Sequence, residues 1–344
     1  MFHAPPLPHS RGPVSQSLIE TLLIGEPGSF VAATLPTGDP LSDDDLHLSL
    51  YICFELVYRG WREVDPAWEW DPGLLELRGH LEHRFLDELR AQIPLVGPMS
   101  PKDTVVALQD LVRGATGPSV SAFIKRRGNI NHMREFAIHR SAYQLKEADP
   151  HTWALPRIPA GRAKSALVKL QYDEYGEGKR RQSHAELFAD SMSALGLDPT
   201  YGHYLDVIPG ATLATVNLMS MFGLRRELLG ECVGHLTVFE MTSVDPMKRY
   251  AAAMRRLTGS EVGAEFYDAH VTADVAHQVI ALCELVPGLL DYEPAFAEHI
   301  VFGAEAVMLL ERRLSEHLLG CWSDHKSSLL PVETTPSTRA AIPA

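Results

Sequence analysis

The sequence predicts an all-α protein, and three observations lead to this prediction. Apolar residues recur with a period near 3.6 over long segments of the chain. Alternating β-branched runs flanked by hairpin turns are nearly absent. Several of the periodic segments end at proline or glycine, which terminate helices. With 344 residues, of which 45% are hydrophobic, the chain can bury one large core or two modest ones.

Two of the expected helix ends have a clear local cause. Asp149–Pro150 should end the sixth helix, because proline lacks an N–H and disfavours a helical residue before it. Gly196, followed by Pro199, should end the eighth with a left-handed residue. In order, the expected helices cover residues 15–23, 43–59, 74–92, 101–113, 119–126, 133–148, 162–175, 183–195, 213–242, 246–257, 260–283 and 294–322.

The chain divides into three regions. Residues 1–128 contain more Pro-Gly pairs that interrupt helices, and fewer candidate metal ligands. We therefore expect them to form an N-terminal helical extension packed on the core. Residues 129–325 should form the helical bundle. Residues 326–344 are rich in Ser, Thr, Pro and Ala, which predicts a disordered tail.

Charge and cysteine content limit the partners and the compartment. A formal net charge of -13 argues against nucleic acid or an anionic membrane as the main partner, since both attract clustered Lys and Arg. No apolar run is long enough to span a bilayer, and the Pro-rich start lacks the apolar centre of a signal peptide. The cysteines lie far apart, which predicts free buried thiols and a cytoplasmic protein; they are Cys53, Cys232, Cys283 and Cys321.

A metal-binding motif lies in the predicted helix 260–283. His270, Asp274 and His277 stand at positions i, i+4 and i+7, so their side chains share one helical face. A helix can hold a metal ion with such a face, although a chain with 16 histidines can also produce this spacing by accident.

Four further candidate ligands precede this motif. Glu147 lies near the end of the sixth predicted helix and Glu174 near the end of the seventh, and His184 follows a glycine-broken turn. Glu240 is flanked by apolar residues, where an acid is costly unless it is paired or coordinated. Together with the helical motif they give four carboxylates and three imidazoles, which suits two iron ions in a helical bundle.

Other residues compete for these roles. Asp173 is the alternative to Glu174, because consecutive helical residues cannot both face inward. Glu135 could replace Glu147, although a salt bridge or a core hydrogen bond is its expected role. His235 is rotated by about 140° from Glu240, which argues against a shared metal. The remaining set lies on a charged helix that we expect to be exposed, and it consists of Glu76, His80 and His83.

The complete pattern resembles the ligand set of the haem-oxygenase-like di-iron oxidases and oxygenases, a family of iron-containing redox enzymes. It is most similar to the bacterial N-oxygenase members, and the resemblance covers residues 134–322. The ligands that it implies are Glu147, Glu174, His184, Glu240, His270, Asp274 and His277.

The resemblance implies a haem-oxygenase-like bundle with two iron ions as cofactor and O2 as co-substrate. The expected activity is non-haem, O2-dependent oxygenation of a small amine or amino-acid-derived substrate (N-oxygenation) in natural-product metabolism. No catalytic residues beyond the metal ligands are expected. An electron donor is needed, and a homodimer is left open. Asp173 or Tyr175 could accept a hydrogen bond from an outer imidazole N–H, and a substrate carboxylate could bind Arg140, Arg157 or Lys164.

Three alternatives remain at this point. A di-iron oxidative lyase, decarboxylase or desaturase would act on a fatty or amino acid and would use a long apolar channel. A haem oxygenase would need a proximal histidine, for which His139 is the candidate. In a non-enzymatic helical binding protein the clustered histidines and acids would only pack and form salt bridges.

Overall fold

The computed structural model describes residues 4–28 and 35–331, and these residues form helices and loops without a β-strand. The prediction of an all-α fold is confirmed. In chain order the α-helices of the described ranges are α1 (Pro13–Ile24), α2 (Asp44–Tyr58), α3 (Pro72–Gln92), α4 (Pro101–Arg113), α5 (Val120–Arg126), α6 (Ile130–Gln144), α7 (Asp149–Thr152), α8 (Arg162–Glu174), α9 (His184–Ala194), α10 (Gly210–Leu224), α11 (Leu229–Thr242), α12 (Val244–Thr258), α13 (Glu265–Ile280), α14 (Val286–Tyr292) and α15 (Phe296–Ser323).

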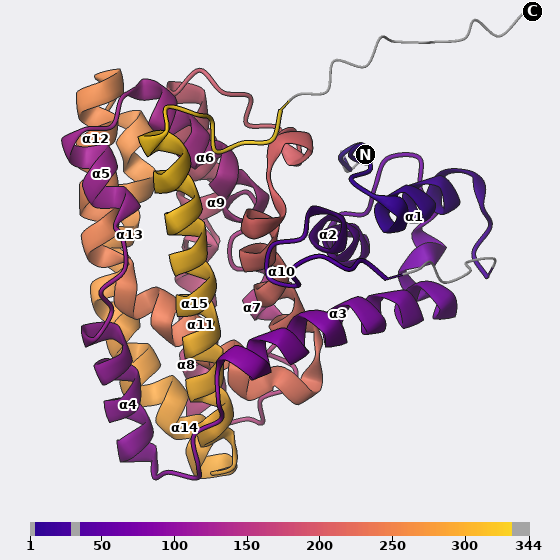
Figure 1. Ribbon diagram of the computed structural model, residues 1–344. Helices are drawn as coiled ribbons and strands as arrows, with labels where there is room; N and C mark the ends of the chain where they lie inside the picture. The colour runs from indigo at the N-terminus through magenta and orange to yellow at the C-terminus, as the bar shows by residue number, and fades with distance from the viewer. Residues whose placement is uncertain (1–3, 29–34, 332–344) are drawn as a thin grey trace, which may run out of the picture.

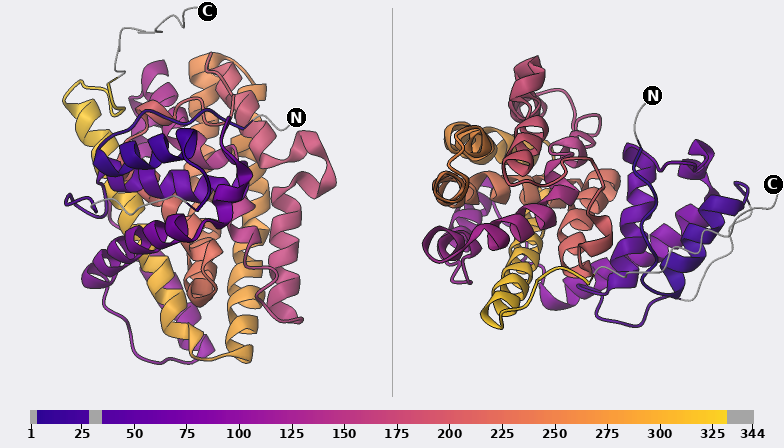
Figure 2. Two further views of the ribbon diagram at one scale, coloured as in Figure 1. Left: turned by 90° about the vertical axis from the view of Figure 1, so that its right-hand side faces the viewer. Right: turned by 90° about the horizontal axis from the view of Figure 1, so that it is seen from above.

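The helices form an elongated bundle with a smaller group at its side. Helices α1, α2 and α3 lie beside the bundle in Figure 1, and the view from above shows the same separation (Figure 2). Helices α4 and α5 belong to the first 128 residues but run along the bundle itself, where α4 packs on α15 and α5 on α12. Within the bundle, α11 packs against α15, and α13 contacts α8, α9, α11 and α12.

The hydrophobic core is continuous between the side group and the bundle. Leu18 of α1, Phe54 of α2 and Phe85 of α3 belong to the same buried cluster as Phe222 of α10 and Leu310 of α15. Helix α2 packs on α10, and burial of this apolar surface holds the two parts together. The N-terminal helices therefore have no separate core of their own.

Two predicted helix boundaries were wrong. The segment predicted as one helix, 213–242, forms α10 and α11, which are separated by a short 3-10 turn at Arg226–Leu228. The guanidinium of Arg157 donates to the carbonyls of Gly223 and Leu224 at the end of α10, so a side chain from elsewhere caps this helix. Helix α6 ends at Gln144, four residues before the predicted end, and Pro150 lies in the first turn of α7, which begins at Asp149, instead of ending α6.

Helix α13 continues through a π-helical turn, Ala281–Leu285, into α14. Pro287 lacks the N–H that would bond to the carbonyl of Cys283, and Arg162 donates to that carbonyl instead. The whole stretch Val262–Tyr292 is long and apolar enough to cross a membrane by length and composition, a feature that the sequence analysis did not expect. It packs on the bundle with only one face: 39% of its apolar window is buried, and Val275 and Val279 are exposed. The buried face carries His270, Asp274 and His277.

The ordered chain extends beyond the predicted start of the tail at residue 326. Ser328 is buried and its hydroxyl donates to Glu135, while the Leu330 N–H donates to the carbonyl of Val207. Residues 326–331 therefore lie against the bundle. The rest of the predicted tail, 332–344, lies outside the described residues.

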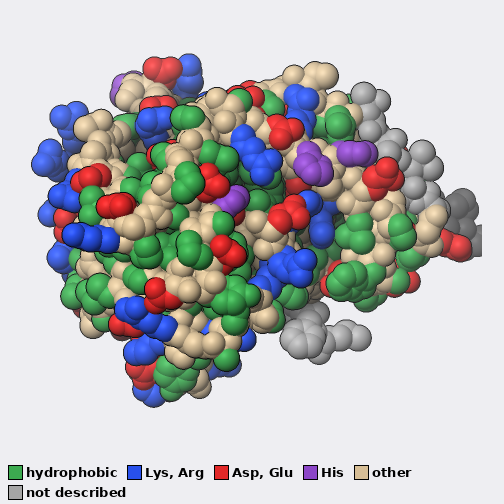
Figure 3. Space-filling model, turned by 90° about the horizontal axis from the view of Figure 1, so that it is seen from below, with side chains coloured by type: hydrophobic (Ala, Val, Ile, Leu, Met, Phe, Trp, Pro, Cys, Tyr) green, Lys and Arg blue, Asp and Glu red, His purple; other side chains and the backbone are tan. Residues whose placement is uncertain are grey.

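The free-thiol prediction holds, but only part of the burial prediction does. All four cysteines are free; Cys53 and Cys232 are buried, whereas Cys283 is exposed and Cys321 is half-buried. On the surface, the face seen from below mixes basic, acidic and hydrophobic side chains (Figure 3). No large patch of either charge dominates that face. The absence of a large basic patch there agrees with the acidic composition of the chain.

Candidate metal centre

The structure brings all seven predicted ligands together in the bundle interior. Their exposed fractions run from 0% for His277 to 9% for Glu147. They form two groups of four whose ligand atoms lie within 4.8 Å of one another, and Glu174 belongs to both groups. The first group is Glu147, Glu174, His184 and His270; the second is Glu174, Glu240, Asp274 and His277.

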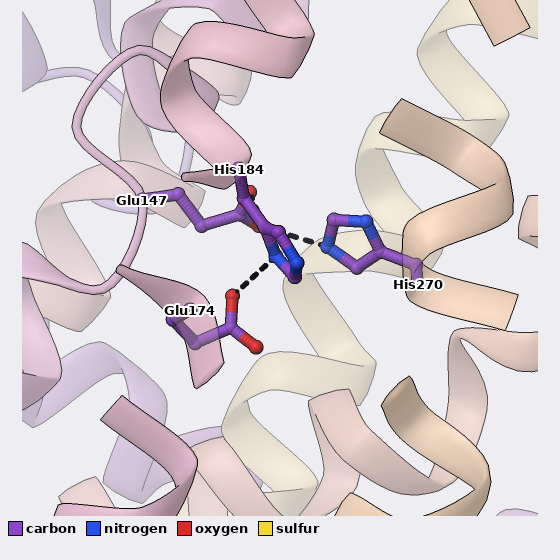
Figure 4. A group of neighbouring side chains, drawn as sticks. All are labelled: Glu147, Glu174, His184 and His270. Carbon is purple, nitrogen blue, oxygen red and sulfur yellow. Dashed lines mark ion pairs between the residues drawn. The ribbon is translucent and has the colours of Figure 1, made fainter. Parts of the chain in front are cut away.

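The residues of the first group come from four parts of the chain. Glu147 lies in the turn after α6, Glu174 ends α8, His184 begins α9 and His270 lies on α13. His184 Nδ1 lies 2.6 Å from Glu174 Oε2 and 3.9 Å from Glu147 Oε2. His270 Nε2 lies 3.5 Å from Glu147 Oε1. Figure 4 shows the two imidazoles and the two carboxylates converging on one point from these separate elements.

The second group surrounds Nδ1 of His277. This atom lies 3.3 Å from Glu240 Oε2, and 3.5 Å from both Glu174 Oε1 and Asp274 Oδ1. Since the other oxygen of Glu174 faces His184, the two groups lie on opposite sides of one carboxylate. Such a carboxylate can bridge two metal ions.

Local sequence explains part of this geometry. The i, i+4, i+7 spacing on α13 aims three side chains at the same side of the helix. Glu174 ends α8 and His184 begins α9, and the chain reverses between them at Gly176, whose φ is 72°. A Cβ at Gly176 would lie 2.4 Å from the backbone N of Ser183, so only glycine allows the two segments to approach this closely.

Hydrogen bonds from outside the cluster orient two of the imidazoles. His277 Nε2 donates to Asp173 Oδ2 at 3.2 Å, and His270 Nδ1 donates to the carbonyl of Phe266 at 2.9 Å. In each ring the opposite nitrogen faces the carboxylates, and it becomes a metal ligand when it loses its proton. Asp173 thus has the supporting role expected for it, whereas the Tyr175 hydroxyl donates to Asp149 instead.

The close packing of acids and imidazoles perturbs their pKa values strongly. Burial disfavours the charge on His270, but Glu147 outweighs it and raises the pKa to about 10. Burial likewise opposes the charge on His277, which Asp274 and Glu240 overcome to give a pKa of about 11. Glu174 has a pKa lowered to about 2, because the nearby histidines outweigh its burial.

Glu240 is shifted in the opposite direction. Burial first, and then the negative charges of Glu174 and Asp274, raise its pKa to about 7. Without a metal, protons therefore supply the positive charge that holds these acids together. A divalent cation can replace those protons, and metal binding would release them.

The donor set fits metal ions, as its unpaired atoms show. Four buried atoms of the cluster have no partner in hydrogen-bond geometry among the described residues: Glu147 Oε2, His184 Nδ1, Asp274 Oδ1 and His277 Nδ1. These atoms lie in ion pairs that lack hydrogen-bond geometry and compensate their burial only in part, and a bound cation would satisfy them. Carboxylate oxygens and imidazole nitrogens are also the donors that iron accepts in helical bundles.

A cavity of about 370 Å³ opens beside the cluster, and Glu147, Glu174 and His270 form part of its wall. Most of the remaining wall is apolar and aromatic. An ion pair stands out against it: Arg140 donates to both carboxylate oxygens of Glu311, at 2.7 and 2.6 Å. The sequence analysis did not find Glu311, because its partner lies on a distant helix and no spacing rule connects them.

The competing residues have other roles in the structure. Glu135, the alternative to Glu147, accepts hydrogen bonds from Trp322 and Ser328, as expected for a core acid. His139, the candidate haem ligand, uses both ring nitrogens for Thr212 and Ser328. His235 pairs with His151 away from Glu240, at 3.1 Å. The set on α3, which comprises Glu76, His80 and His83, is exposed.

The three basic residues that could bind a substrate carboxylate lie in different surroundings. Arg140 lines the cavity, whereas Arg157 is occupied by the carbonyls at the end of α10. Lys164 is half-buried on α8 and does not line the cavity.

Comparison with known proteins assigns the chain to a family. A model of the iron-containing redox enzyme family matches residues 134–312, which include all seven residues of the cluster. The chain is also 26% identical over 151 residues to a nitrosourea synthase from Streptomyces achromogenes subsp. streptozoticus. That match covers 44% of this chain and 32% of the synthase, so the chain spans only about a third of the length of this relative. The protein is an all-α oxidoreductase, and it belongs to the family of iron-containing redox enzymes.

Proposed function

We propose that the protein is a non-haem di-iron oxygenase that uses O2 to oxidise a small amine or amino-acid-derived substrate at nitrogen, in natural-product metabolism. One observation carries the proposal. Two groups of buried carboxylates and imidazoles share Glu174 and form part of the wall of a ligand-sized cavity. Bound iron would supply the electrons and the oxygen activation that such a reaction requires.

The protein residues have separate tasks in this proposal. Glu147, His184 and His270 would hold one iron, and Glu240, Asp274 and His277 the other, with Glu174 between them. Asp173 keeps the proton of His277 on Nε2, so Nδ1 is available as a ligand.

The cavity favours a small polar substrate. Its volume lies within the range of about 300–1,000 Å³ that is typical of small-molecule sites. The Arg140–Glu311 pair can bind a carboxylate and an ammonium group, respectively. Three buried polar atoms on the cavity wall have no partner among the described residues: Gln144 Oε1, Gln171 Nε2 and Tyr267 O–H. A substrate with several hydrogen-bonding groups would satisfy them, whereas a fatty acid chain would not.

A second candidate reaction is oxidative cleavage, decarboxylation or desaturation of an amino or fatty acid. The apolar part of the cavity favours it, since Phe136, Phe188 and Phe239 line the wall. The nitrosourea synthase match supports the nitrogen oxidation instead, although it covers only part of that protein. We also propose a cytoplasmic location, a separate electron donor and no nucleic-acid or membrane partner.

Anaerobic loading with ferrous iron, followed by stopped-flow mixing with O2, tests the proposal. We expect two equivalents of iron per chain and O2 consumption that one member of an amine and acid panel accelerates. Mass spectrometry of that reaction should show one added oxygen on the amine. Loss of carbon dioxide or a new double bond would favour the second candidate. Binding of less than one equivalent, with no reaction towards O2, would overturn both.

A further inference from the structure

Outside the family-matched region, one acid of the N-terminal helices reaches the metal centre indirectly. Glu55 of α2 is completely buried, and its Oε2 lies 2.9 Å from Nζ of Lys146, which is also buried. The Tyr201 hydroxyl donates to the same oxygen at 2.7 Å. Lys146 directly precedes Glu147, the first ligand of the cluster. The ion pair therefore joins α2 to the ligand-bearing turn.

This turn lies outside the α-helical ladder and has short i→i−3 bonds instead: the Lys146 N–H donates to the carbonyl of Tyr143 at 2.8 Å, and the Glu147 N–H donates to that of Gln144 at 3.3 Å. Helix α6 ends at Gln144 and α7 begins at Asp149, which leaves Glu147 in the intervening turn. Ala148 has a φ of 75°, a conformation that a residue with a side chain adopts only when its surroundings impose it. Contacts from outside the turn therefore add to these local bonds in fixing the position of Glu147.

Helix α2 supplies those contacts. The Arg59 guanidinium donates to the carbonyl of Leu145 at 2.9 Å. The rings of Tyr51 and Tyr58 flank the Lys146 ammonium at 4.5 and 4.4 Å. Within the turn, Lys146 reaches towards α2 while Glu147 reaches into the metal cluster, so fixing one side chain sets the direction of the other.

Stability alone is a poor explanation for this arrangement. A fully buried ion pair loses its hydration on both sides and is often no better than apolar residues of the same size. Its benefit is a defined geometry. We propose that Glu55 and Lys146 are positioning residues that hold Glu147 in its metal-binding position, so that the N-terminal extension forms part of the metal centre. This inference rests on the proposed di-iron function of the cluster.

The test uses the full chain and manganese(II) as the probe. The main variant is the double substitution Glu55→Gln with Lys146→Met, which removes both charges and leaves neither unpaired. Manganese equivalents and affinities are measured by titration, and electron paramagnetic resonance distinguishes a coupled pair of ions from a single ion. Thermal unfolding reports whether each variant is folded.

We expect the wild-type protein to bind two ions with a coupled spectrum. In the double variant, the group that contains Glu147 should bind at least tenfold more weakly, and the spectrum should become that of a single ion. The other group, around His277, should keep its ion. Arg59→Met is an independent and milder variant, because Arg59 is exposed, and it should weaken the same ion several-fold.

Asn217→Ala is the matched control. Asn217 of α10 donates to the backbone carbonyl of His47 at 2.8 Å, so it joins the same two parts of the molecule away from the turn. This control should lower the unfolding temperature and still bind two ions.

The outcomes separate the two proposals. If the wild-type protein binds fewer than two ions, the di-metal function fails before the variants are considered. If it binds two, and the double variant binds both with unchanged affinity, the positioning role is overturned. Equal loss of metal in Asn217→Ala would also overturn it, because general destabilisation would then explain the result. If the double variant does not fold, the Arg59→Met variant is the test. Binding of both ions with unchanged affinity in that variant would overturn the positioning role.

Discussion

Glu174 is the carboxylate that both groups of the candidate metal centre share. Its two oxygens face different imidazoles, His184 on one side and His277 on the other. Neighbouring positive charge outweighs burial and keeps its pKa low, so it is ionised in the metal-free protein as well. A shared acid of this kind would fix the spacing between two bound metal ions, and no other residue of the cluster belongs to both groups.

Substitution of Glu174 should therefore affect both metal sites. We expect Glu174→Gln to lower ferrous iron binding from two equivalents per chain to less than one, because an amide oxygen is a weak ligand and cannot bridge two ions. His277→Ala should remove only one equivalent. Colorimetric iron analysis after anaerobic loading and desalting measures both results.

Glu135→Gln is the control for this experiment. Glu135 is an acid of the same bundle that bonds to Trp322 and Ser328, outside the cluster. The Glu135→Gln variant should retain two equivalents of iron per chain. Equal losses in Glu174→Gln and His277→Ala would contradict the bridging role.

At the scale of secondary structure, the turn between α6 and α7 has a strained backbone. Ala148 combines a φ of 75° with a ψ of -32°, although it is fully surrounded by protein. Such a backbone costs on the order of 1–3 kcal/mol for a residue other than glycine. The strain persists because Arg59, Lys146 and α7 fix the chain on both sides.

Glycine should relieve this strain. We expect Ala148→Gly to raise the free energy of unfolding by about 1 kcal/mol, after the greater entropy of glycine in the unfolded chain is subtracted. Urea unfolding of the metal-free protein measures the change. In contrast, Ala252→Gly at an exposed position inside α12 should lower stability by about 1 kcal/mol. A loss of stability in both variants would show that the turn is unstrained.

At the scale of the whole molecule, the packing of α2 against α10 buries a neutral histidine. His47 Nε2 donates to the carbonyl of Pro40 at 2.9 Å, and the ring packs edge-on against Phe85. Burial lowers the pKa of His47 to about 3, from 6.5. Below pH 6.5, His47 binds a proton in the unfolded chain but stays neutral in the folded protein. The stability linked to His47 is therefore complete above pH 6.5 and is lost as the pH falls towards 3.

A comparison of variants isolates this effect from the other titrating groups. The difference in free energy of unfolding between wild type and His47→Gln should shift against wild type by about 1.4 kcal/mol for each pH unit below 6.5. Urea unfolding at several values between pH 7.5 and 5 measures it. His270 and His277 do not confuse the result, because both proteins contain them and their contribution cancels in the difference. A difference that does not change with pH would show that His47 accepts its proton in the folded protein.

The sequence by itself determined the all-α class and most helices, and it predicted the seven candidate ligands through their chemistry and a family resemblance. The helices follow from the periodicity of apolar residues. The spacing on α13 puts His270, Asp274 and His277 on one face of the helix, regardless of which elements pack against that face. Only the tertiary structure decided that Glu147 lies in a turn held by α2, that Arg157 caps α10, and that Arg140 meets Glu311 across the cavity. Each of these depends on side chains far apart in the sequence, and helical periodicity carries no record of which distant residues will meet.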